Sequence, residues 1–185
     1  MKESELLHTI QNDPKKFSEI FHFYYKPIFG YILRRTGNVD DTADIAANTF
    51  LKAYTHISNF NYKGISIKVW LYRIATNEVN MYFRSRQRRN TLFESADDKN
   101  ILLFKNYLQQ DKEELEAELH KHEQFLAVLN ALKTLPGKYQ DVIALKYFEG
   151  KDNKEIAAIL NLNEGTLKSL LSRGLEKLRK KCNHF

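Results

Sequence analysis

The sequence predicts an all-α protein of two small helical domains joined by a flexible or helical linker, with a helix-turn-helix in the C-terminal domain. The 185-residue chain has only seven glycines and three prolines, and apolar residues recur at helical spacing along most of it. Residues 135–181 have the pattern of a helix-turn-helix. We place the domains at residues 1–90 and 123–185, with an acidic linker over residues 91–122.

Four helices are predicted in the first domain, over residues 3–11, 14–35, 40–57 and 66–88. Pro14 suits the first turn of the second helix, with Asp13 as its cap. The pair Gly37-Asn38 ends that helix, and Asp40 and Asp41 favour the start of the next one. Residues 59–64 break the periodicity and are expected to form a loop. Within the fourth helix, Trp70, Ile74 and Tyr82 are expected in the core.

The second domain begins with a helix before Leu135. Gly150 is expected to close the first helix of the motif, and Asp152 or Asn153 to cap the second. After a turn at residues 161–163, Asn163 is placed to cap the third helix. That helix carries an apolar stripe at Leu167, Leu170, Leu171, Leu175 and Leu178. Its other faces carry short polar and basic side chains, a pattern that suits a DNA major groove but also a solvated helical hairpin.

The net charge of +6 is unevenly distributed, with +6 over residues 1–90, −4 over 91–122 and +4 over 123–185. Two basic blocks favour a polyanionic partner. The single cysteine, Cys182, fits a reducing cytoplasm. No apolar run is long enough to span a membrane, so no membrane insertion is expected.

The predicted fourth helix combines aromatic residues with five arginines between residues 73 and 89. Basic residues interleaved with aromatics suit a single strand, whose bases stack while its phosphates are neutralised. The preceding loop carries Phe60 and Tyr62, which could hold an unstacked base or could fold back onto the core. We find no catalytic constellation, no metal-ligand set and no cofactor motif, so no enzymatic activity is expected.

In this order, the motifs resemble a known family. FSEIFHFYYKPIFGYILRRTGNVDDTADIAANTFLKAY and KVWLYRIATNEVNMYFRSRQRR resemble region 2 of bacterial sigma factors, and LPGKYQDVIALKYFEGKDNKEIAAILNLNEGTLKSLLSRGLEKLRKK resembles their region 4. With no domain between them, the chain is similar to the small extracytoplasmic-function (ECF) branch. The resemblance implies core RNA polymerase and promoter DNA, duplex and melted, as partners. An anti-sigma factor is a possible further partner.

The resemblance also implies site residues. The minus-ten DNA set is Phe60, Tyr62, Lys63, Gly64, Ser66, Asn77, Asn80 and Arg84. The minus-thirty-five DNA set is Lys146, Thr166, Lys168, Ser169, Ser172 and Arg173. The core polymerase set is Asp40, Asp44, Ile45, Asn48, Phe50, Leu51 and Tyr54. The sequence departs from the family pattern at Ala47-Asn48, where Gln-Glu is usual, and at Leu170, where arginine is common.

These residues together predict a sigma factor that directs promoter recognition, DNA melting and transcription initiation. The alternative is a stand-alone helix-turn-helix regulator, which would hold duplex DNA tightly as a dimer without polymerase. A third possibility is a helical adaptor whose basic faces are simply solvated, and which would show no salt-dependent DNA binding.

Overall fold

The described part of the protein consists of helices joined by short turns. The computed structural model describes residues 16–60, 65–89 and 128–182. In the N-terminal half, α2 (Phe17–Thr36), α3 (Val39–His56) and α4 (Ile67–Arg89) pack against one another, with a short 3-10 turn, η2 (Ile57–Asn59), after α3. The C-terminal half contains α7 (Gly137–Ile143), the π-helical segment η3 (Ala144–Phe148), α8 (Asn153–Leu160) and α9 (Glu164–Cys182). Residues 128–133 form a further helical turn before α7.

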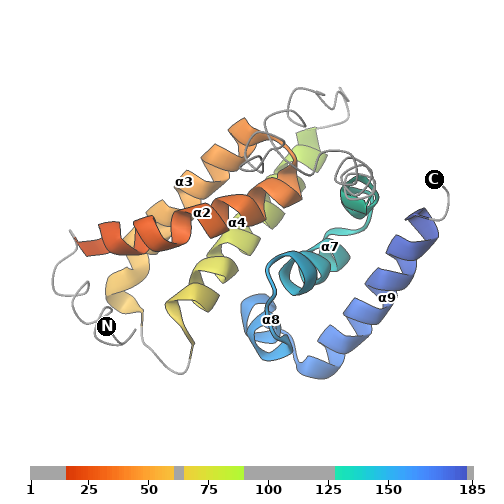
Figure 1. The fold of residues 1–185 in the computed structure, drawn as a ribbon. Helices are drawn as coiled ribbons and strands as arrows, with labels where there is room; N and C mark the ends of the chain where they lie inside the picture. The colour runs from red at the N-terminus through yellow and green to blue at the C-terminus, as the bar shows by residue number, and fades with distance from the viewer. Residues whose placement is uncertain (1–15, 61–64, 90–127, 183–185) are drawn as a thin grey trace, which may run out of the picture.

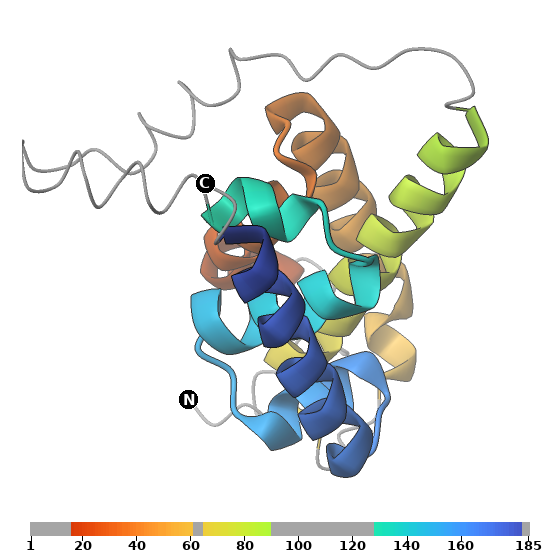
Figure 2. The ribbon, with the colours of Figure 1, turned by 90° about the vertical axis from the view of Figure 1, so that its right-hand side faces the viewer.

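The two halves lie side by side (Figure 1). α7 and α8 occupy the space between the α2–α4 pair and α9, and α9 forms the outer edge of the molecule on the side away from α3. The view turned by 90° shows the same order, with α9 in front and α3 behind (Figure 2). A single cluster of buried apolar side chains includes residues of both halves, among them Ile32, Leu71, Leu132, Leu145 and Ile156. The halves therefore share one core in this arrangement.

Local chemistry explains where the helices of the first half begin and end. Gly37 adopts a left-handed conformation with φ of 67°, and its N–H donates to the Leu33 carbonyl at 2.8 Å, which closes α2. Asn38 then caps α3 by accepting from the Asp41 N–H at 2.9 Å. The sequence analysis expects Asn38 only to end α2. An asparagine can end one helix or cap the next, and the sequence does not show that Asn38 also caps α3.

The helix-turn-helix also follows its local signals. Gly150 has φ of 60°, and Asp152 forms a reciprocal capping box with Glu155 at the start of α8. Asn161, at φ 54°, ends α8 in the left-handed region. Asn163 then accepts from the Thr166 N–H at 2.7 Å, as predicted, and starts α9.

Two expectations need correction. The first helix of the motif is not a single α-helix, because α7 widens into the π-helical segment η3, where the Glu149 N–H donates to the Ala144 carbonyl at 3.0 Å. Periodicity does not distinguish a π-turn from an α-turn. Trp70, Ile74 and Tyr82 are half-buried at the border of the core, which is filled instead by Val69, Leu71, Tyr72, Ala75 and Val79. The predicted helix 3–11, the cap at Asp13 and the linker 91–122 lie outside the described residues.

Close packing of α7 against α9 depends on Gly174. This residue is buried in α9, and a Cβ there would lie 3.2 Å from Ile143 Cδ1 and 3.3 Å from Tyr139 Cδ1. Those two side chains are themselves buried, so they have little room to move. Gly174 thus sets the distance between the two helices.

We therefore expect Gly174→Val to lower the free energy of unfolding by about 1–3 kcal/mol, since it overpacks this contact. Urea denaturation followed by circular dichroism measures the loss. Gly165→Val is the matched control on the same helix, because position 165 is exposed and a Cβ there would meet Asn163 Oδ1 only at 3.5 Å. Equal stability of the two variants would contradict the packing role.

Candidate functional site

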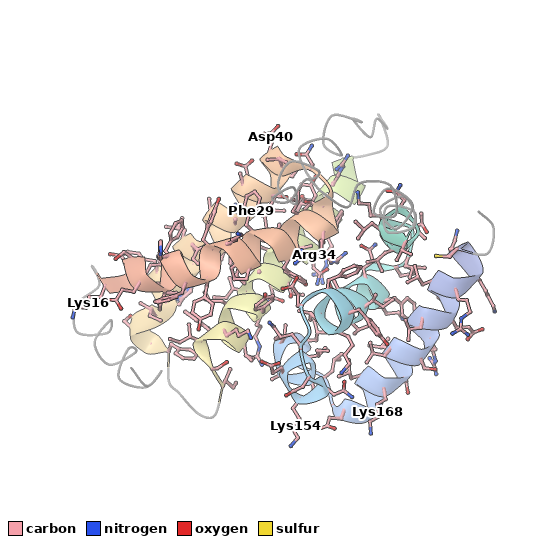
Figure 3. All side chains as sticks on the ribbon, viewed as in Figure 1. Lys16, Phe29, Arg34, Asp40, Lys154 and Lys168 are labelled. Atoms are coloured by element: carbon pink, nitrogen blue, oxygen red, sulfur yellow. The ribbon has the colours of Figure 1, made fainter. Side chains whose placement is uncertain are left out.

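The predicted minus-thirty-five residues gather mainly on α9. Lys168, Ser169, Ser172 and Arg173 are exposed, whereas Leu167 on the same helix is completely buried. Thr166 is exposed in the first turn of α9. Figure 3 shows Lys168 and Lys154, from α9 and α8, at one end of the molecule. Short polar and basic side chains near the start of a supported helix suit contact with base edges and phosphates in a major groove.

The sixth member of this set, Lys146, lies apart on η3. It is half-buried, and its ammonium group donates to Asn153 Oδ1 at 3.0 Å. The charge therefore lies beside the start of α8. Leu170, which stands where the family commonly has arginine, is half-buried and faces a groove of about 710 Å³ between α4 and the helix-turn-helix. An apolar residue suits that location because Ile159 and Leu160 of α8 line the same groove.

The described minus-ten residues are distributed along α4 and the turn before it. Phe60 is half-buried and packs on Trp70 with ring centroids 4.6 Å apart. The Ser66 hydroxyl accepts from the Val69 N–H at 3.2 Å and so caps the first turn of α4. Asn77 and Arg84 are exposed. Tyr62, Lys63 and Gly64 lie outside the described residues.

Asn80 differs from the other members of the minus-ten set. Its amide donates to Asp141 Oδ2 of α7 at 3.2 Å, across the boundary between the halves. The structure therefore brings Asn80 to the helix-turn-helix rather than to solvent. Asn77 and Asn80 line the same groove as Thr166 and Leu170.

The core polymerase set follows α3 and divides into two groups by exposure. Asp40, Asp44, Asn48, Leu51 and Tyr54 are exposed, with Leu51 61% and Tyr54 48% accessible. Their spacing of three or four residues places them along one side of the helix. Figure 3 shows Asp40 at the top of the molecule, whereas Lys168 of α9 lies near the bottom. Ile45 and Phe50 are 5% and 4% accessible. These two side chains are covered by the protein itself, so a direct contact with a partner is not available to them.

An aromatic surface beside this face was missed in the sequence analysis. Phe21 and Phe23 of α2 are 44% and 68% accessible. Phe21 contacts Phe50 of α3 with centroids 5.0 Å apart, and Phe17 contacts Tyr54 at 5.3 Å. The apolar surface of α3 therefore continues onto α2. The sequence does contain a sign of this surface, because aromatic residues occur on more than one face of the helical segment 17–29. A small core cannot cover all of these faces, so some of the aromatic side chains must be exposed.

The charged contacts between the halves were also missed. Arg35 of α2 is 1% accessible, and its guanidinium contacts Asp141 Oδ1 at 3.0 Å through Nε and 2.8 Å through an Nη atom. Arg34 pairs with Glu149, which also accepts from the Tyr72 hydroxyl at 2.6 Å. Sequence patterns cannot pair charges more than one hundred positions apart, so only the fold reveals these partners.

Burial changes the ionisation of this boundary. Desolvation raises the pKa of Asp141 despite the neighbouring Arg35 guanidinium. Burial and the nearby Glu149 carboxylate raise the pKa of Tyr72. The pKa of Lys151 is lowered to about 8, mainly by burial and secondly by the neighbouring Lys68 ammonium. The Lys151 Nζ atom lies 4.2 Å from the centre of the Tyr72 ring. The boundary is therefore a desolvated polar contact inside a shared core.

Two negative observations apply to the described residues. Within them, no three His, Cys, Asp or Glu side chains gather where a metal ion could be held. In the same part of the chain, no helix is both long enough and apolar enough to cross a bilayer.

Comparisons with known proteins decide the family. The pattern of sigma-70 region 2 matches residues 20–89, and that of sigma-70 region 4 matches residues 125–178. The chain is 32% identical over 170 residues to the ECF RNA polymerase sigma factor SigW of Bacillus subtilis, covering 92% of this chain and 90% of SigW. The chain belongs to the ECF RNA polymerase sigma factors. It directs promoter recognition and transcription initiation.

Other relatives agree with this assignment. This sigma factor is 26% identical to RNA polymerase sigma-H factor of Pseudomonas aeruginosa, with 97% of this chain and 93% of the relative covered. Two solved structures share the fold. The first is the sigma factor RpoE in complex with the anti-sigma factor NepR from Bartonella quintana, with a TM-score of 0.67 and 20% identity; the match covers 91% of this chain and 98% of that one. The second is CnrH in complex with the cytosolic domain of CnrY, with a TM-score of 0.68 and 17% identity; the match covers 98% of this chain and 97% of that one.

The lowered pKa of Lys151 predicts a pH effect on stability. The unfolded chain keeps the Lys151 proton up to the ordinary pKa of 10.5, whereas the folded protein releases it above about 8. Because the unfolded state binds more protons in this window, the contribution of Lys151 to the free energy of unfolding rises from pH 8 toward pH 10. Lys151→Met should lack this rise, as urea denaturation at pH 7, 8 and 9.5 would measure. Parallel pH dependence of the two proteins would contradict the shift.

Proposed function

We propose that residues 1–90 bind core RNA polymerase and read the minus-ten element, that residues 123–185 read the minus-thirty-five element, and that residues 91–122 connect them. The observation that carries this division is the separation of two exposed surfaces by the fold. The apolar and acidic side of α3 lies on one side of the molecule, and the basic, hydroxyl-rich face of α9 lies on the other (Figures 1 and 3).

The exposed side of α3 is the proposed polymerase contact. Leu51 and Tyr54 offer apolar area in the last turns of α3, and Asp40, Asp44 and Asn48 provide polar groups earlier along the same side. Protein interfaces typically combine apolar and polar area in this way. Ile45 and Phe50 support the surface from within by fixing α3 on the core, and the α2 aromatics extend it. Asn48, in place of the usual glutamate, leaves this face less acidic than in many relatives.

The DNA contacts are proposed to divide into duplex and single-strand recognition. On α9, Lys168 and Arg173 are positioned for phosphates or guanine edges, with Thr166, Ser169 and Ser172 available for base or backbone contacts. On α4 and the preceding loop, Asn77, Asn80 and Arg84 would meet the melted strand together with Phe60, Tyr62, Lys63, Gly64 and Ser66. Unstacked bases captured there would offset part of the free energy lost when the duplex opens.

The remaining elements of the proposal concern how the protein works in the cell. It acts in the cytoplasm as a specificity subunit and contributes no chemical step of its own. Because solved relatives are complexes with an anti-sigma factor or a cytosolic protein domain, an anti-sigma factor is proposed as a further partner. Pull-down from native cells should recover it together with polymerase.

Run-off transcription with purified core polymerase tests the proposed function. Genomic fragments, including the region upstream of the protein's own coding sequence, serve as templates. Discrete starts that depend on the protein are expected. An absence of new starts, together with tight duplex binding by the protein alone, would favour a stand-alone regulator.

Leu51→Glu should weaken core polymerase binding by about tenfold or more, because it places a charge in the apolar part of the proposed contact. The side chain is 61% accessible, so the melting temperature should hardly change. Fluorescence anisotropy of the labelled protein, titrated with core polymerase, gives the affinity. Met81→Glu is the matched control, since Met81 is 52% accessible on α4. Equal losses in both variants would show that the effect is not specific to α3.

Arg173→Ala should leave core polymerase binding unchanged and lower run-off transcription by roughly 5- to 150-fold, the range for loss of about 1–3 kcal/mol at one base contact. Lys180→Ala provides the control, because this substitution also removes one positive charge from α9. Lys180 lies in the last turn of the helix, where it pairs with Glu176 at 2.7 Å. Similar losses for both variants would indicate a general charge effect rather than a contact at Arg173.

A further inference from the structure

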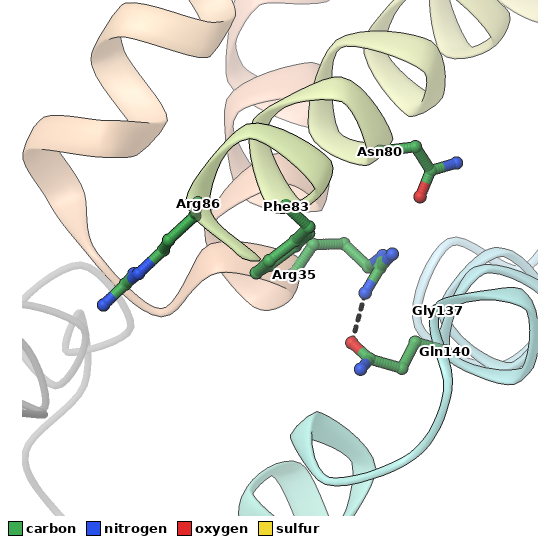
Figure 4. A pocket seen from close by; sticks show the side chains of 6 residues that line it. All are labelled: Arg35, Asn80, Phe83, Arg86, Gly137 and Gln140. Atoms are coloured by element: carbon green, nitrogen blue, oxygen red, sulfur yellow. Dashed lines mark hydrogen bonds between the residues drawn. The ribbon is translucent and has the colours of Figure 1, made fainter. Parts of the chain in front are cut away.

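A pocket separate from the exposed sides of α3 and α9 lies where α2, α4 and α7 meet. Its volume is about 340 Å³, a size typical of sites for small molecules. Figure 4 shows the side chains around it, with Arg35 in the middle, Arg86 at one end and Asn80 at the other. The lining residues are Arg35, Asn80, Phe83, Arg86, Gly137 and Gln140.

Arg35 brings a buried hydrogen-bond donor to this pocket. The residue is 1% accessible. Its Nε donates to Asp141 Oδ1 at 3.0 Å, and its Nη1 donates to Gln140 Oε1, the bond drawn in Figure 4. Its Nη2 lies 2.8 Å from Asp141 Oδ1 but has no hydrogen-bond partner among the described residues. A buried N–H group without an acceptor is unfavourable, so Nη2 favours a ligand that supplies one.

Asn80 brings an acceptor to the same end of the pocket. Its amide nitrogen donates to Asp141 Oδ2 at 3.2 Å. Because a carboxylate only accepts, this bond fixes which end of the amide is the nitrogen and turns the oxygen the other way. A Cβ at Gly137 would lie 3.8 Å from Asn80 Oδ1 and 3.9 Å from Arg35 Nη2. The donor and the acceptor therefore lie around one point beside Gly137.

A donor beside an acceptor selects a ligand edge that carries the opposite pair. A carboxylate or a phosphate carries acceptors alone and would be repelled by the Asn80 oxygen. Adenine carries an acceptor, N7, next to a donor, the N6 amino group, whereas the same edge of guanine carries two acceptors. This end of the pocket is therefore matched to adenine.

The other two side chains suit the rest of a nucleotide. Phe83 is half-buried in the wall beside Arg35, with 5.6 Å from the Arg35 guanidinium carbon to the centre of its ring, and it offers aromatic surface to a base. The Arg86 side chain is 44% accessible at the far end.

The charge of Arg86 is only partly used within the protein. Its Nη1 donates to the Tyr82 hydroxyl at 2.9 Å. Asp41 Oδ2 lies 3.9 Å from the same atom, beyond hydrogen-bond distance, and so offsets part of the charge. A guanidinium has further N–H groups, and their planar arrangement is suited to phosphate oxygens.

We propose that this pocket binds one adenine nucleotide. The base meets Arg35 and Asn80 with its N7–N6 edge and lies against Phe83, and the phosphate meets Arg86 at the exposed end. The inference goes beyond the proposed function and does not rest on it. Since Asn80 also belongs to the proposed minus-ten set, the nucleotide and a melted strand would compete for this side chain.

Equilibrium dialysis of the full-length protein against radiolabelled AMP tests the site. Saturable binding is expected, and unlabelled GMP should compete about tenfold less well, because one of its acceptors would face the Asn80 oxygen. Ribose 5-phosphate and inorganic phosphate, which lack the base, should compete less well still. The absence of saturable binding below about 1 mM AMP, or equal competition by GMP or by phosphate, would overturn the proposal.

Gly137→Leu blocks the pocket from the side of α7. A Cβ at this position makes only ordinary contacts, at 3.8 Å and 3.9 Å, so the longer side chain extends into the space for the base without straining the backbone. AMP affinity should fall at least tenfold, by roughly the loss of one well-made base contact, while the melting temperature is retained. Gly165→Leu, at an exposed position of α9, is the matched control. A folded Gly137→Leu protein with wild-type AMP affinity would contradict the site.

Arg86→Ala tests the phosphate end without altering the buried end. AMP affinity should fall by about tenfold, the effect of losing a charge-assisted hydrogen bond, whereas adenosine, which lacks the phosphate, should bind the variant and the wild type equally. Arg179→Ala removes the same charge from an exposed position of α9 and is the control. Equal losses for AMP and adenosine, or an equal loss of AMP binding in the control, would overturn the assignment of Arg86.

A short oligoadenylate strand distinguishes a free nucleotide from one base of a nucleic acid. The strand should displace labelled AMP no better than unlabelled AMP does, because the pocket has room for a single nucleotide. Displacement more than about tenfold better, abolished by Gly137→Leu, would show that the pocket holds a base of a strand. That outcome would overturn the proposal of a free nucleotide.

Discussion

The arrangement of the whole molecule depends on the contact between Arg35 and Asp141. Arg35 is a permanently charged side chain on α2 of the first half. Asp141 is a carboxylate on α7, the first helix of the C-terminal motif. Both are buried, so each requires the other in order to remain in the interior. As long as this pair holds, α7 and α8 stay on α2 and α4, and the apolar side chains of both halves form one core.

The same contact specifies how the two halves pack. Buried ion pairs add little net stability but strongly disfavour arrangements in which one partner loses the other. Asp141 receives both Arg35 and Asn80, so the pair and the amide together fix α7 on α2 and α4. Asn80 is therefore half-buried at this boundary.

Much of the fold followed from local signals in the sequence. Helix ends are marked by residues with a specific backbone role: the glycines Gly37 and Gly150 end helices, and Asp152 and Asn163 cap them. The ends of the helices and the turn of the helix-turn-helix were therefore predicted within a residue or two. The π-helical turn at Ala144–Phe148 was not, because it shares the apolar spacing of an α-helix. Which apolar residues are fully buried also required the fold: Trp70 and Tyr82 lie at the core's border because α4 is covered on only part of its circumference.

The site was less accessible from the sequence than the fold. Exposed residues at helical spacing on α3 and α9 could be assigned by resemblance, but Ile45 and Phe50 match the same pattern and are buried. Arg35 and Asp141 gave no signal, since a charged residue in a helix is usually solvated and its partner lies 106 positions away. Long-range pairing of charges is a property of the packed halves, not of either segment.

Tethered DNA cleavage tests the central claim, that one chain reads two promoter elements with two different surfaces. A cleavage reagent is attached to a single cysteine, either Ser169→Cys or Asn77→Cys, in the Cys182→Ser protein bound to core polymerase on a promoter found by run-off transcription. The two positions should cut DNA at sites centred about 25 base pairs, roughly 85 Å, apart. Cleavage of the same short segment from both positions would contradict the claim.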